Sequence, residues 1–247
     1  MSGKFEGKTI VVTGGDSGIG GAITRLFCEE GGVTYFLARN RERGQRFEAE
    51  LRKQGFHAVY LSCDVTDKTA IEKVRSRIHS DDRIIDILVN NAGILLTGTL
   101  DEITDDDWDA TYQTNVKGAL YTCQVMIDDL KQSKGVILNN ASINGLHSYI
   151  KGRKSYMYAT SKSALIQFTK YLAKNYAPDV RVNCLCPGST VTNLFTNKDF
   201  SRFEGTNLLN RMADPMEIAK VALFLCSDDA SFMTGSIVVA DGGETLM

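Results

Sequence analysis

The sequence predicts an α/β fold in which helices cover both faces of one parallel sheet of about seven strands. Short runs rich in β-branched residues alternate with longer amphipathic stretches over the whole chain. Most of these runs are too apolar to leave one face in water, which is typical of parallel strands covered on both sides. No linker or low-complexity tract interrupts the 247 residues. We therefore expect one doubly wound domain over residues 1–247.

The expected elements follow one another in β-α order. Strands are expected at 9–14, 33–38, 57–62, 86–91, 135–140, 180–186 and 236–240. Helices are expected after the first strand and at 41–54, 67–79, 105–131, 156–177 and 215–227. Thr104 before three aspartates is typical of a helix start, while Pro178 ends one helix and Pro215 opens another. Regular structure is weakest in 143–155 and 189–212.

Composition argues against several classes of function. The formal net charge is -2, and no block of Lys or Arg points to nucleic acid or to an anionic membrane surface. The N-terminal segment resembles no signal peptide, and no stretch approaches the ~18 apolar residues that span a bilayer. We therefore expect a cytoplasmic protein. The six cysteines are expected to be buried thiols, and three scattered histidines indicate no metal site.

The first strand leads directly into a glycine-rich turn, TGGDSGIG at 13–20, and then into an amphipathic helix. Gly14, Gly18 and Gly20 let the backbone turn sharply and approach a ligand closely. A helix N-terminus at that point attracts the negative charge of a pyrophosphate. The spacing differs from G-x-G-x-x-G, but the position after the first strand predicts a dinucleotide site of Rossmann type.

In a Rossmann-type fold, side chains at the end of the second strand contact the adenosine ribose. An acid there binds the 2′-hydroxyl of NAD, whereas an arginine accommodates the 2′-phosphate of NADP. The chain has Ala38 in place of the acid and then Arg39, which favours NADP(H); Arg41 and Arg43 are expected to solvate a helix start. Asp16 is a contrary signal, since it would repel a 2′-phosphate unless Arg39 neutralises it. NAD(H) therefore remains an alternative.

Two further strand ends contribute to the expected site. Asp64 ends the third strand, where its side chain can meet the adenine edge or cap a turn. The sequence VNNAG at 89–93 ends the fourth strand with small residues, which suits a backbone that passes against a flat ligand. Asn90 in this run can be purely structural.

The segment SYMYATSK at 155–162 holds a candidate catalytic acid. Of the three neighbouring tyrosines, only Tyr158 has a lysine four residues later, Lys162, on the same helix face. A free tyrosine has a pKa of about 10 and is a poor acid at neutral pH. A cation beside it favours the phenolate and lowers that pKa towards the working range of a general acid.

The chain resembles the short-chain dehydrogenase/reductase family over essentially its full length. The matching pieces occur in the family's order: TGGDSGIG (13–20), DV (64–65), NNAG (90–93), Asn115 of TNVKG, Ser142 of NNASINGL, YATSK (158–162), PGSTVT (187–192) and DGG (241–243). The resemblance implies an oxidoreductase that interconverts a ketone and a secondary alcohol by hydride transfer with a nicotinamide cofactor.

The resemblance also assigns roles to single residues. Tyr158 would protonate the carbonyl oxygen during reduction and act as the base in reverse. Lys162 would lower the pKa of that tyrosine and hold the nicotinamide ribose. Ser142 would hydrogen-bond the substrate carbonyl, and Asn115 would bind a water that relays protons towards Lys162. The residues expected to bind the cofactor are Gly14, Asp16, Ser17, Gly18, Ile19, Gly20, Arg39, Asp64, Val65, Asn91, Ala92, Gly93, Tyr158, Lys162, Pro187, Gly188, Thr190 and Thr192.

Two alternatives stay open. One is an NAD-dependent dehydrogenase of a sugar, polyol or hydroxysteroid. The other is a nicotinamide-binding regulatory protein without turnover, which the complete set of Asn115, Ser142, Tyr158 and Lys162 argues against, because a binder needs no acid. The family resemblance further implies a homotetramer or a homodimer.

Two segments around the expected site vary from the family. The stretch between Ser142 and Tyr158, which includes the segment 143–155, is about three residues longer than is usual in the family. It brings Lys151, Arg153 and Lys154 near the tyrosine, where they could attract an anionic substrate or form a solvated loop. The segment 189–212 would cap the cleft. Its apolar residues, which would accept a hydrophobic substrate body or pack onto the core, are Phe195, Phe200, Phe203, Leu208, Leu209 and Met212.

Overall fold

The computed structural model describes residues 3–146, 154–192 and 205–247. Its centre is one sheet of seven parallel strands in the order β3-β2-β1-β4-β5-β6-β7. The strands are β1 (Thr9–Thr13), β2 (Val33–Ala38), β3 (Ala58–Ser62), β4 (Ile87–Asn90), β5 (Val136–Asn140), β6 (Arg181–Pro187) and β7 (Ile237–Ala240). Each matches its predicted range to within one residue at either end, so the α/β prediction is confirmed.

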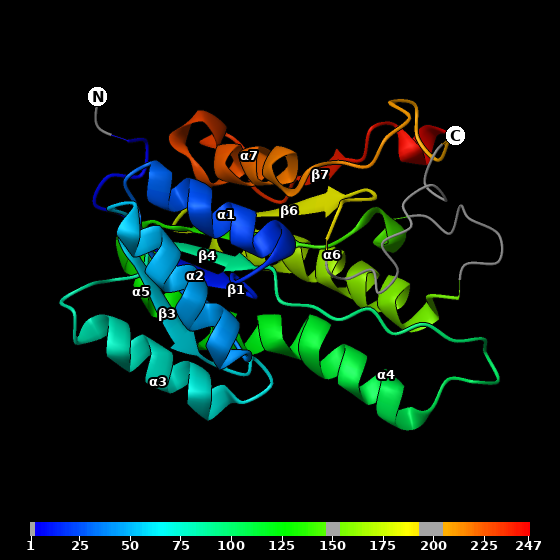
Figure 1. Cartoon of the computed structure of the whole chain (residues 1–247), viewed down its shortest axis with the longest axis horizontal. Helices are drawn as coiled ribbons and strands as arrows, with labels where there is room; N and C mark the ends of the chain where they lie inside the picture. Colours follow the sequence, from blue (N-terminus) through cyan, green and yellow to red (C-terminus); the bar gives the residue numbers. More distant parts are fainter. Residues whose placement is uncertain (1–2, 147–153, 193–204) are drawn as a thin grey trace.

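Helices cover both faces of this sheet. They are α1 (Gly18–Glu29), α2 (Arg41–Lys53), α3 (Lys68–His79), α4 (Asp105–Tyr112), α5 (Gly118–Ser133), α6 (Tyr156–Tyr176) and α7 (Pro215–Cys226). Figure 1 shows α1 and α7 together on one side of the sheet and α3 and α5 on the other. Short 3₁₀ turns follow three of the elements: η2 (Ile143–Gly145), η4 (Asp228–Ala230) and η5 (Glu244–Leu246).

The prediction of one uninterrupted helix over 105–131 is wrong. A π-helical turn, η1 (Gln113–Lys117), separates α4 from α5, and α5 continues to Ser133. The predicted start is correct, because the Thr104 side chain and Asp107 cap each other's backbone N–H groups. Pro215 likewise opens α7. The π turn re-aims the side chains that follow it.

The core lies in layers above and below the sheet because successive strand residues point to opposite faces. On β1, Ile10 and Val12 pack with Phe27 of α1, whereas Val11 packs with Met126 of α5. Burying each such side chain contributes about 1.5–3 kcal/mol. All six cysteines are buried free thiols within these layers. Within the described ranges, no helix has the length and apolar character that crossing a bilayer requires.

A chain of buried polar side chains joins the centre of the sheet to two helices. Thr122 of α5 donates to Asn90 Oδ1 at 2.6 Å, and Asn90 Nδ2 donates to Asn139 Oδ1 at 2.9 Å. Asn139 Nδ2 then donates to Thr169 Oγ1 of α6 at 2.9 Å. An unsatisfied buried amide costs about 1–3 kcal/mol, so these bonds fix how α5 and α6 sit on β4 and β5. Asn90 thus has the structural role.

The strand order reverses beside β1, where β1 lies between β2 and β4. Chain connections leave the sheet in opposite directions at this point, so a crevice opens at the carboxyl ends of β1 and β4. The glycine-rich turn follows β1, and the VNNAG residues follow β4. The fold therefore brings the predicted motifs to one edge of the sheet.

A buried carboxylate also links α3 to α5. Asp129 is only 2% exposed, accepts from Arg75 Nε at 3.1 Å, and lies 2.8 Å from His79 Nε2. Burial acts to raise the pKa of Asp129, but the hydrogen bonds from Arg75 and His79 outweigh it and lower the pKa below its ordinary value. The ionised carboxylate therefore stabilises the folded state.

We predict that Asp129→Asn lowers the free energy of unfolding by about 1–2 kcal/mol at neutral pH, because charge-assisted hydrogen bonds are lost. Since the folded-state pKa is depressed, the contribution is complete above the unfolded pKa of about 3.9 and disappears as the pH falls further. Denaturant titrations of wild type and variant at pH 7 and below pH 4 measure this. The exposed neighbour provides a control, Asp128→Asn, and equal effects of the two substitutions would contradict the prediction.

Candidate active site

A cleft of about 1090 Å³ opens at the carboxyl ends of the strands. It is lined by nearly all the residues predicted to bind the cofactor or to act in catalysis. These are Gly14, Asp16, Ser17, Gly18, Ile19, Gly20, Arg39, Asp64, Val65, Asn91, Ala92, Gly93, Ser142, Tyr158, Lys162, Pro187, Gly188, Thr190 and Thr192. Asn115 does not line this cleft and lies behind it. The fold thus joins motifs that are up to 178 positions apart into one surface.

The glycine-rich turn is shaped by close backbone approach. Gly14 and Gly18 have positive φ values of 61° and 53°, which glycine adopts without strain. A Cβ on Gly20 would lie 2.1 Å from the Gly14 carbonyl oxygen. Asn91 fastens the turn to β4 by donating from Nδ2 to the carbonyl oxygens of Thr13 and Gly14 at 3.0 and 3.1 Å. The residues therefore form a tight cradle before the N-terminus of α1, as phosphate binding requires.

The charged residues at the adenosine end pair differently from the prediction. Arg43, in the first turn of α2, donates from Nε to Asp16 Oδ2 at 2.7 Å. Arg39 instead lies 3.9 Å from Asp64 and is mostly exposed. The expectation that Arg43 only solvates a helix start is therefore wrong, and the residue that pairs with Asp16 is Arg43, where the sequence offered Arg39 as the possible partner. Asp16 and Arg43 are 27 residues apart in the sequence, so no local pattern could predict that they pair.

Lys162 lies at the buried end of the cleft. Its side chain donates from Nζ to the Asn140 carbonyl oxygen at 2.8 Å and is only 4% exposed as a residue. Nζ lies 5.6 Å from the centre of the Tyr158 ring, so the predicted pair shares one face of α6. Burial lowers the pKa of Lys162 to about 8. The lysine is therefore still mainly charged at neutral pH, and its cation faces the phenol ring.

Tyr158 and Ser142 come to the cleft from two different elements. Tyr158 is buried in the first turn of α6, whereas Tyr156 is exposed and does not line the cleft. Ser142 lies two positions after the last residue of β5, and its Oγ accepts from the Asn144 N–H at 3.2 Å as the cap of η2. The tyrosine that the Tyr-Lys spacing selects thus lines the cleft, whereas Tyr156 does not, and Tyr149 lies outside the described residues.

Asn115 supports the site from behind, in the π turn η1. Its Oδ1 accepts from the Ile94 N–H at 2.8 Å, and its Nδ2 donates at 3.0 Å to both the Ile94 carbonyl and Ser161 Oγ. A Cβ on Gly93 would lie 3.2 Å from Asn115 Oδ1 and 3.4 Å from Lys162 Nζ. Both Nδ2 hydrogens of Asn115 are donated to protein acceptors. A water that relays protons would therefore have to bind to another atom of Asn115.

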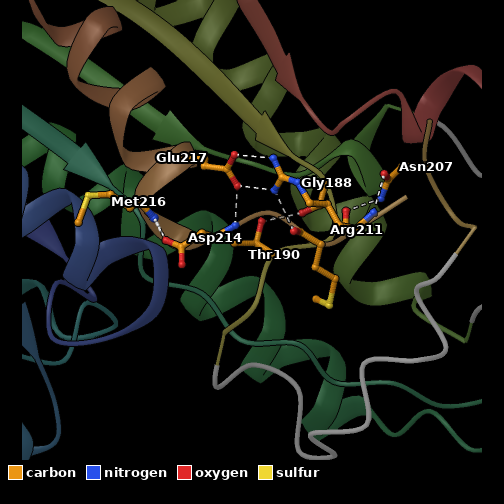
Figure 2. Close-up of polar contacts among 8 residues, drawn as sticks. Gly188, Thr190, Asn207, Arg211, Asp214, Met216 and Glu217 are labelled. Atoms are coloured by element: carbon orange, nitrogen blue, oxygen red, sulfur yellow. Dashed lines mark hydrogen bonds and ion pairs between the residues drawn. The ribbon is translucent and has the colours of Figure 1, made fainter. Parts of the chain in front are cut away.

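The wall beside β6 is fastened by a polar network (Figure 2). The Arg211 guanidinium donates to both oxygens of Glu217 at 2.7 Å, and this contact lowers the pKa of Glu217 to about 2. Glu217 also accepts from the Asp214 N–H at 2.9 Å. Asn207 Nδ2 donates to the Arg211 carbonyl at 2.9 Å. The network anchors the end of the 189–212 segment to the start of α7.

The residue Ala213, which lies between Arg211 and Asp214, connects this network to the cleft wall through its backbone. Ala213 pairs with Thr190 in an isolated parallel bridge, and Thr190 Oγ1 donates to the Gly188 carbonyl at 3.0 Å. Leu208 and Leu209 of the same segment are exposed and do not line the cleft. Of the other expected capping residues, Met212 is half-buried and does not line the cleft, while Phe195, Phe200 and Phe203 lie outside the described residues.

Sequence reasoning missed some residues of the cleft. Glu244 is 1% exposed and accepts from Ser189 N–H at 2.9 Å and Ser189 Oγ at 3.2 Å; no motif signals this residue beyond its place after DGG. The cleft wall also includes the apolar residues Ile94, Leu95, Leu96 and Ile143. Lys154 is exposed and lies 4.0 Å from Glu102, while Lys151 and Arg153 lie outside the described residues.

Comparison with known proteins identifies a matching family and full-length relatives. A family model described as enoyl-(acyl carrier protein) reductase matches residues 14–245. Cyclopentanol dehydrogenase from Comamonas sp. is 35% identical, covering 98% of this chain and 99% of the relative. The 3-oxoacyl-(acyl-carrier-protein) reductase FabG of Chlamydia pneumoniae is 36% identical, with 97% of each chain covered.

A solved structure agrees with these matches. The crystal structure of a short-chain type dehydrogenase/reductase from Mycobacterium marinum superimposes with a TM-score of 0.93 and 30% identity. The alignment covers 98% of this chain and 97% of that one. The likeness therefore extends over the sheet, the helices and the cleft together.

We predict that Gly20→Ala weakens binding of a nicotinamide dinucleotide by about 5- to 150-fold, because overpacking at the turn costs about 1–3 kcal/mol. The added Cβ would lie 2.1 Å from the Gly14 carbonyl and 2.3 Å from Asn91 Nδ2. Fluorescence titration with NADPH measures the change. Gly21→Ala is the matched control, since its Cβ would meet nothing nearer than 3.4 Å. Equal affinities for the two variants would contradict the prediction.

Proposed function

Because this chain belongs to the short-chain dehydrogenase/reductase family, we propose that it is an NADP(H)-dependent oxidoreductase that interconverts a ketone and a secondary alcohol. The observation that carries the proposal is the shared cleft. Tyr158 and Lys162 of α6 line the same cleft as the glycine-rich turn after β1. A protein that only binds a nucleotide would need the turn but not the buried Tyr-Lys pair.

In the proposed reaction the cofactor, when bound, supplies or accepts the hydride. Tyr158 gives its phenolic proton to the carbonyl oxygen during reduction, and it takes the proton back when an alcohol is oxidised. Ser142 Oγ donates a hydrogen bond to the same oxygen and orients the carbonyl. The Lys162 cation stabilises the phenolate that remains on Tyr158. Its ammonium also has donors for the ribose hydroxyls beyond the one that Asn140 accepts.

The charges at the adenosine end support the preference for NADP(H). Arg39 and Arg43 both line the cleft near the end of β2, where a Rossmann fold holds the adenosine ribose. The nearby Asp16 is already paired with Arg43, so a 2′-phosphate would meet less uncompensated negative charge. The preference rests on these side chains and not on the names of the relatives.

The apolar wall of Ile94, Leu95, Leu96 and Ile143 supports a substrate with a hydrophobic body. One relative is a cyclopentanol dehydrogenase and another a 3-oxoacyl-(acyl-carrier-protein) reductase, so cyclic alcohols and acyl chains are both represented among similar proteins. The first of these names favours a second candidate, oxidation of a secondary alcohol, for which NAD would be the acceptor if Asp16 binds the 2′-hydroxyl of the ribose. Reduction with NADPH remains our leading proposal.

We also propose that the chain forms a homo-oligomer. The strand β7 is the last strand of the sheet, so its outer edge pairs with no other strand among the residues that the structure describes. Val239 of β7 is exposed there, and Phe224 and Phe232 are exposed on the preceding segments. Exposed apolar residues near an open sheet edge are typical of a protein contact surface.

We predict that Tyr158→Phe abolishes turnover, with a loss of at least ~100-fold, while NADPH affinity stays within about three-fold of wild type. Only the phenolic oxygen is removed, and the ring still fills its place. NADPH oxidation with a panel of ketones that includes cyclopentanone, and fluorescence titration with NADPH, measure the two effects.

The exposed tyrosine two positions earlier gives the matched control, Tyr156→Phe, which should keep both properties. Full activity of Tyr158→Phe would contradict the proposed acid. Failure of the wild-type protein to bind any nicotinamide nucleotide would contradict the proposed function as a whole.

A further inference from the structure

Glu244 is an acidic residue in the wall of the cleft that no step of the proposed reaction uses. It is only 1% exposed, although it belongs to η5, a short turn in which Leu246 is 80% exposed. Taking an acidic side chain out of water costs free energy unless hydrogen bonds satisfy it. The burial of Glu244 is therefore best understood from the groups that it contacts.

The two carboxyl oxygens of Glu244 contact one residue of the segment after β6. Oε2 accepts from the Ser189 N–H at 2.9 Å, and Oε1 accepts from the Ser189 hydroxyl at 3.2 Å. A Cβ on Gly188 would lie 3.0 Å from Glu244 Oε2 and 2.7 Å from Asp241 Cα. The turn that follows β7 thus packs directly on the backbone of the segment that follows β6.

The turn that carries Glu244 is held by its own hydrogen bonds. The Asp241 side chain accepts from the Gly243 N–H at 2.9 Å and from the Thr245 N–H and hydroxyl at 2.8 Å each. Gly242 and Gly243 have positive φ values of 64° and 82°, which glycine adopts without strain. Glu244 therefore meets Ser189 from a well-defined support.

The segment 188–192 runs between the two ends of the cleft. Before it, β6 pairs with β5, and Ser142 lies two positions after the end of β5. At its far end, the side chain of Thr192 lies 3.3 Å from the position of a Cβ on Gly18, in the glycine-rich turn. The segment forms part of the cleft wall. A dinucleotide that reaches from the phosphate cradle to the Tyr-Lys pair would lie along it.

Resting on the proposed function, we propose that Glu244 is a positioning residue for hydride transfer, because its two hydrogen bonds from Ser189 fix the segment 188–192 beside the cofactor. Glu244 itself transfers neither proton nor hydride. Hydride transfer needs the reacting atoms about 3–3.5 Å apart, and a displacement of about 1 Å can cost about 10²-fold in rate. Nucleotide affinity draws on a longer surface that includes the glycine-rich turn. Loss of Glu244 should therefore slow the chemical step more than it weakens binding.

The test compares wild type with Glu244→Ala, Glu244→Gln, Ser189→Ala and the double variant Glu244→Ala/Ser189→Ala. Each protein is saturated with NADPH and mixed rapidly with an excess of the ketone that wild type reduces fastest. The amplitude of the single turnover counts competent sites, whereas the rate constant reports the chemistry within them. A merely structural role would lower the amplitude alone. Fluorescence titration gives the dissociation constant of NADPH, and Leu246→Ala is the matched control in the same turn.

We expect Glu244→Ala to lower the single-turnover rate constant by about 10- to 100-fold and to change NADPH affinity by about three-fold or less. Glu244→Gln should recover most of the rate, since the amide oxygen can accept from the Ser189 N–H and the amide nitrogen can donate to its hydroxyl. Ser189→Ala keeps the N–H bond and should lose about three- to ten-fold. The double variant should lose no more than Glu244→Ala, because both changes remove one interaction. Leu246→Ala should match wild type.

An unchanged rate constant in Glu244→Ala would overturn the inference, and so would a loss confined to the amplitude. Equal losses in Glu244→Ala and Glu244→Gln would show that charge matters and the hydrogen bonds to Ser189 do not. Losses that multiply in the double variant would show that Glu244 acts through another contact. If Glu244→Ala does not fold, a wild-type rate constant in Ser189→Ala overturns the inference. All these results leave wild-type turnover intact, whereas a wild type that turns over no ketone of the panel overturns the proposed function as well.

Discussion

The buried hydrogen-bond chain from Thr122 through Asn90 and Asn139 to Thr169 is the constraint on which the site depends. Every member is fully or almost fully buried, so a shift of either helix would leave an amide unsatisfied at a cost of about 1–3 kcal/mol. Apolar contacts alone tolerate sliding, because dispersion has little directionality. The amides therefore fix α5 and α6 relative to the ends of β4 and β5, and with them the π turn and the Tyr-Lys face.

A further consequence of this arrangement is that the region around Lys162 is closely packed. Lys162 is held by the Asn140 carbonyl, and Gly93 is close to both Lys162 and Asn115. A charge in such surroundings interacts more strongly with a nearby phenol than it would in water. Burial that lowers the pKa of Lys162 to about 8 leaves the cation in place at neutral pH. The contacts that hold Lys162 in place therefore also keep its charge close to the Tyr158 ring.

The sequence was sufficient where structure depends on local patterns, and insufficient where it depends on pairing across distance. The seven strands could be predicted because parallel strands need apolar runs, and the glycine-rich turn because positive φ values need glycine. The π turn at 113–117 could not, since its residues have no distinctive local pattern and it is held by bonds from Asn115 to Ile94 and Ser161. The Asp16–Arg43 pair escaped for the same reason.

The two ends of the cleft therefore differ in how firmly the fold specifies them. Around the Tyr-Lys pair, Lys162, Asn115 and Ser142 are all less than a tenth exposed, and each is held by protein partners. Near the end of β2, Arg39 and Arg43 have side chains 64% and 40% exposed, so replacing either disturbs little of the core. Chemistry that depends on buried groups resists change, whereas exposed charges can be exchanged at little cost to folding. Under the proposed function, such a site would keep one reaction while a few residues at the rim set the nucleotide preference.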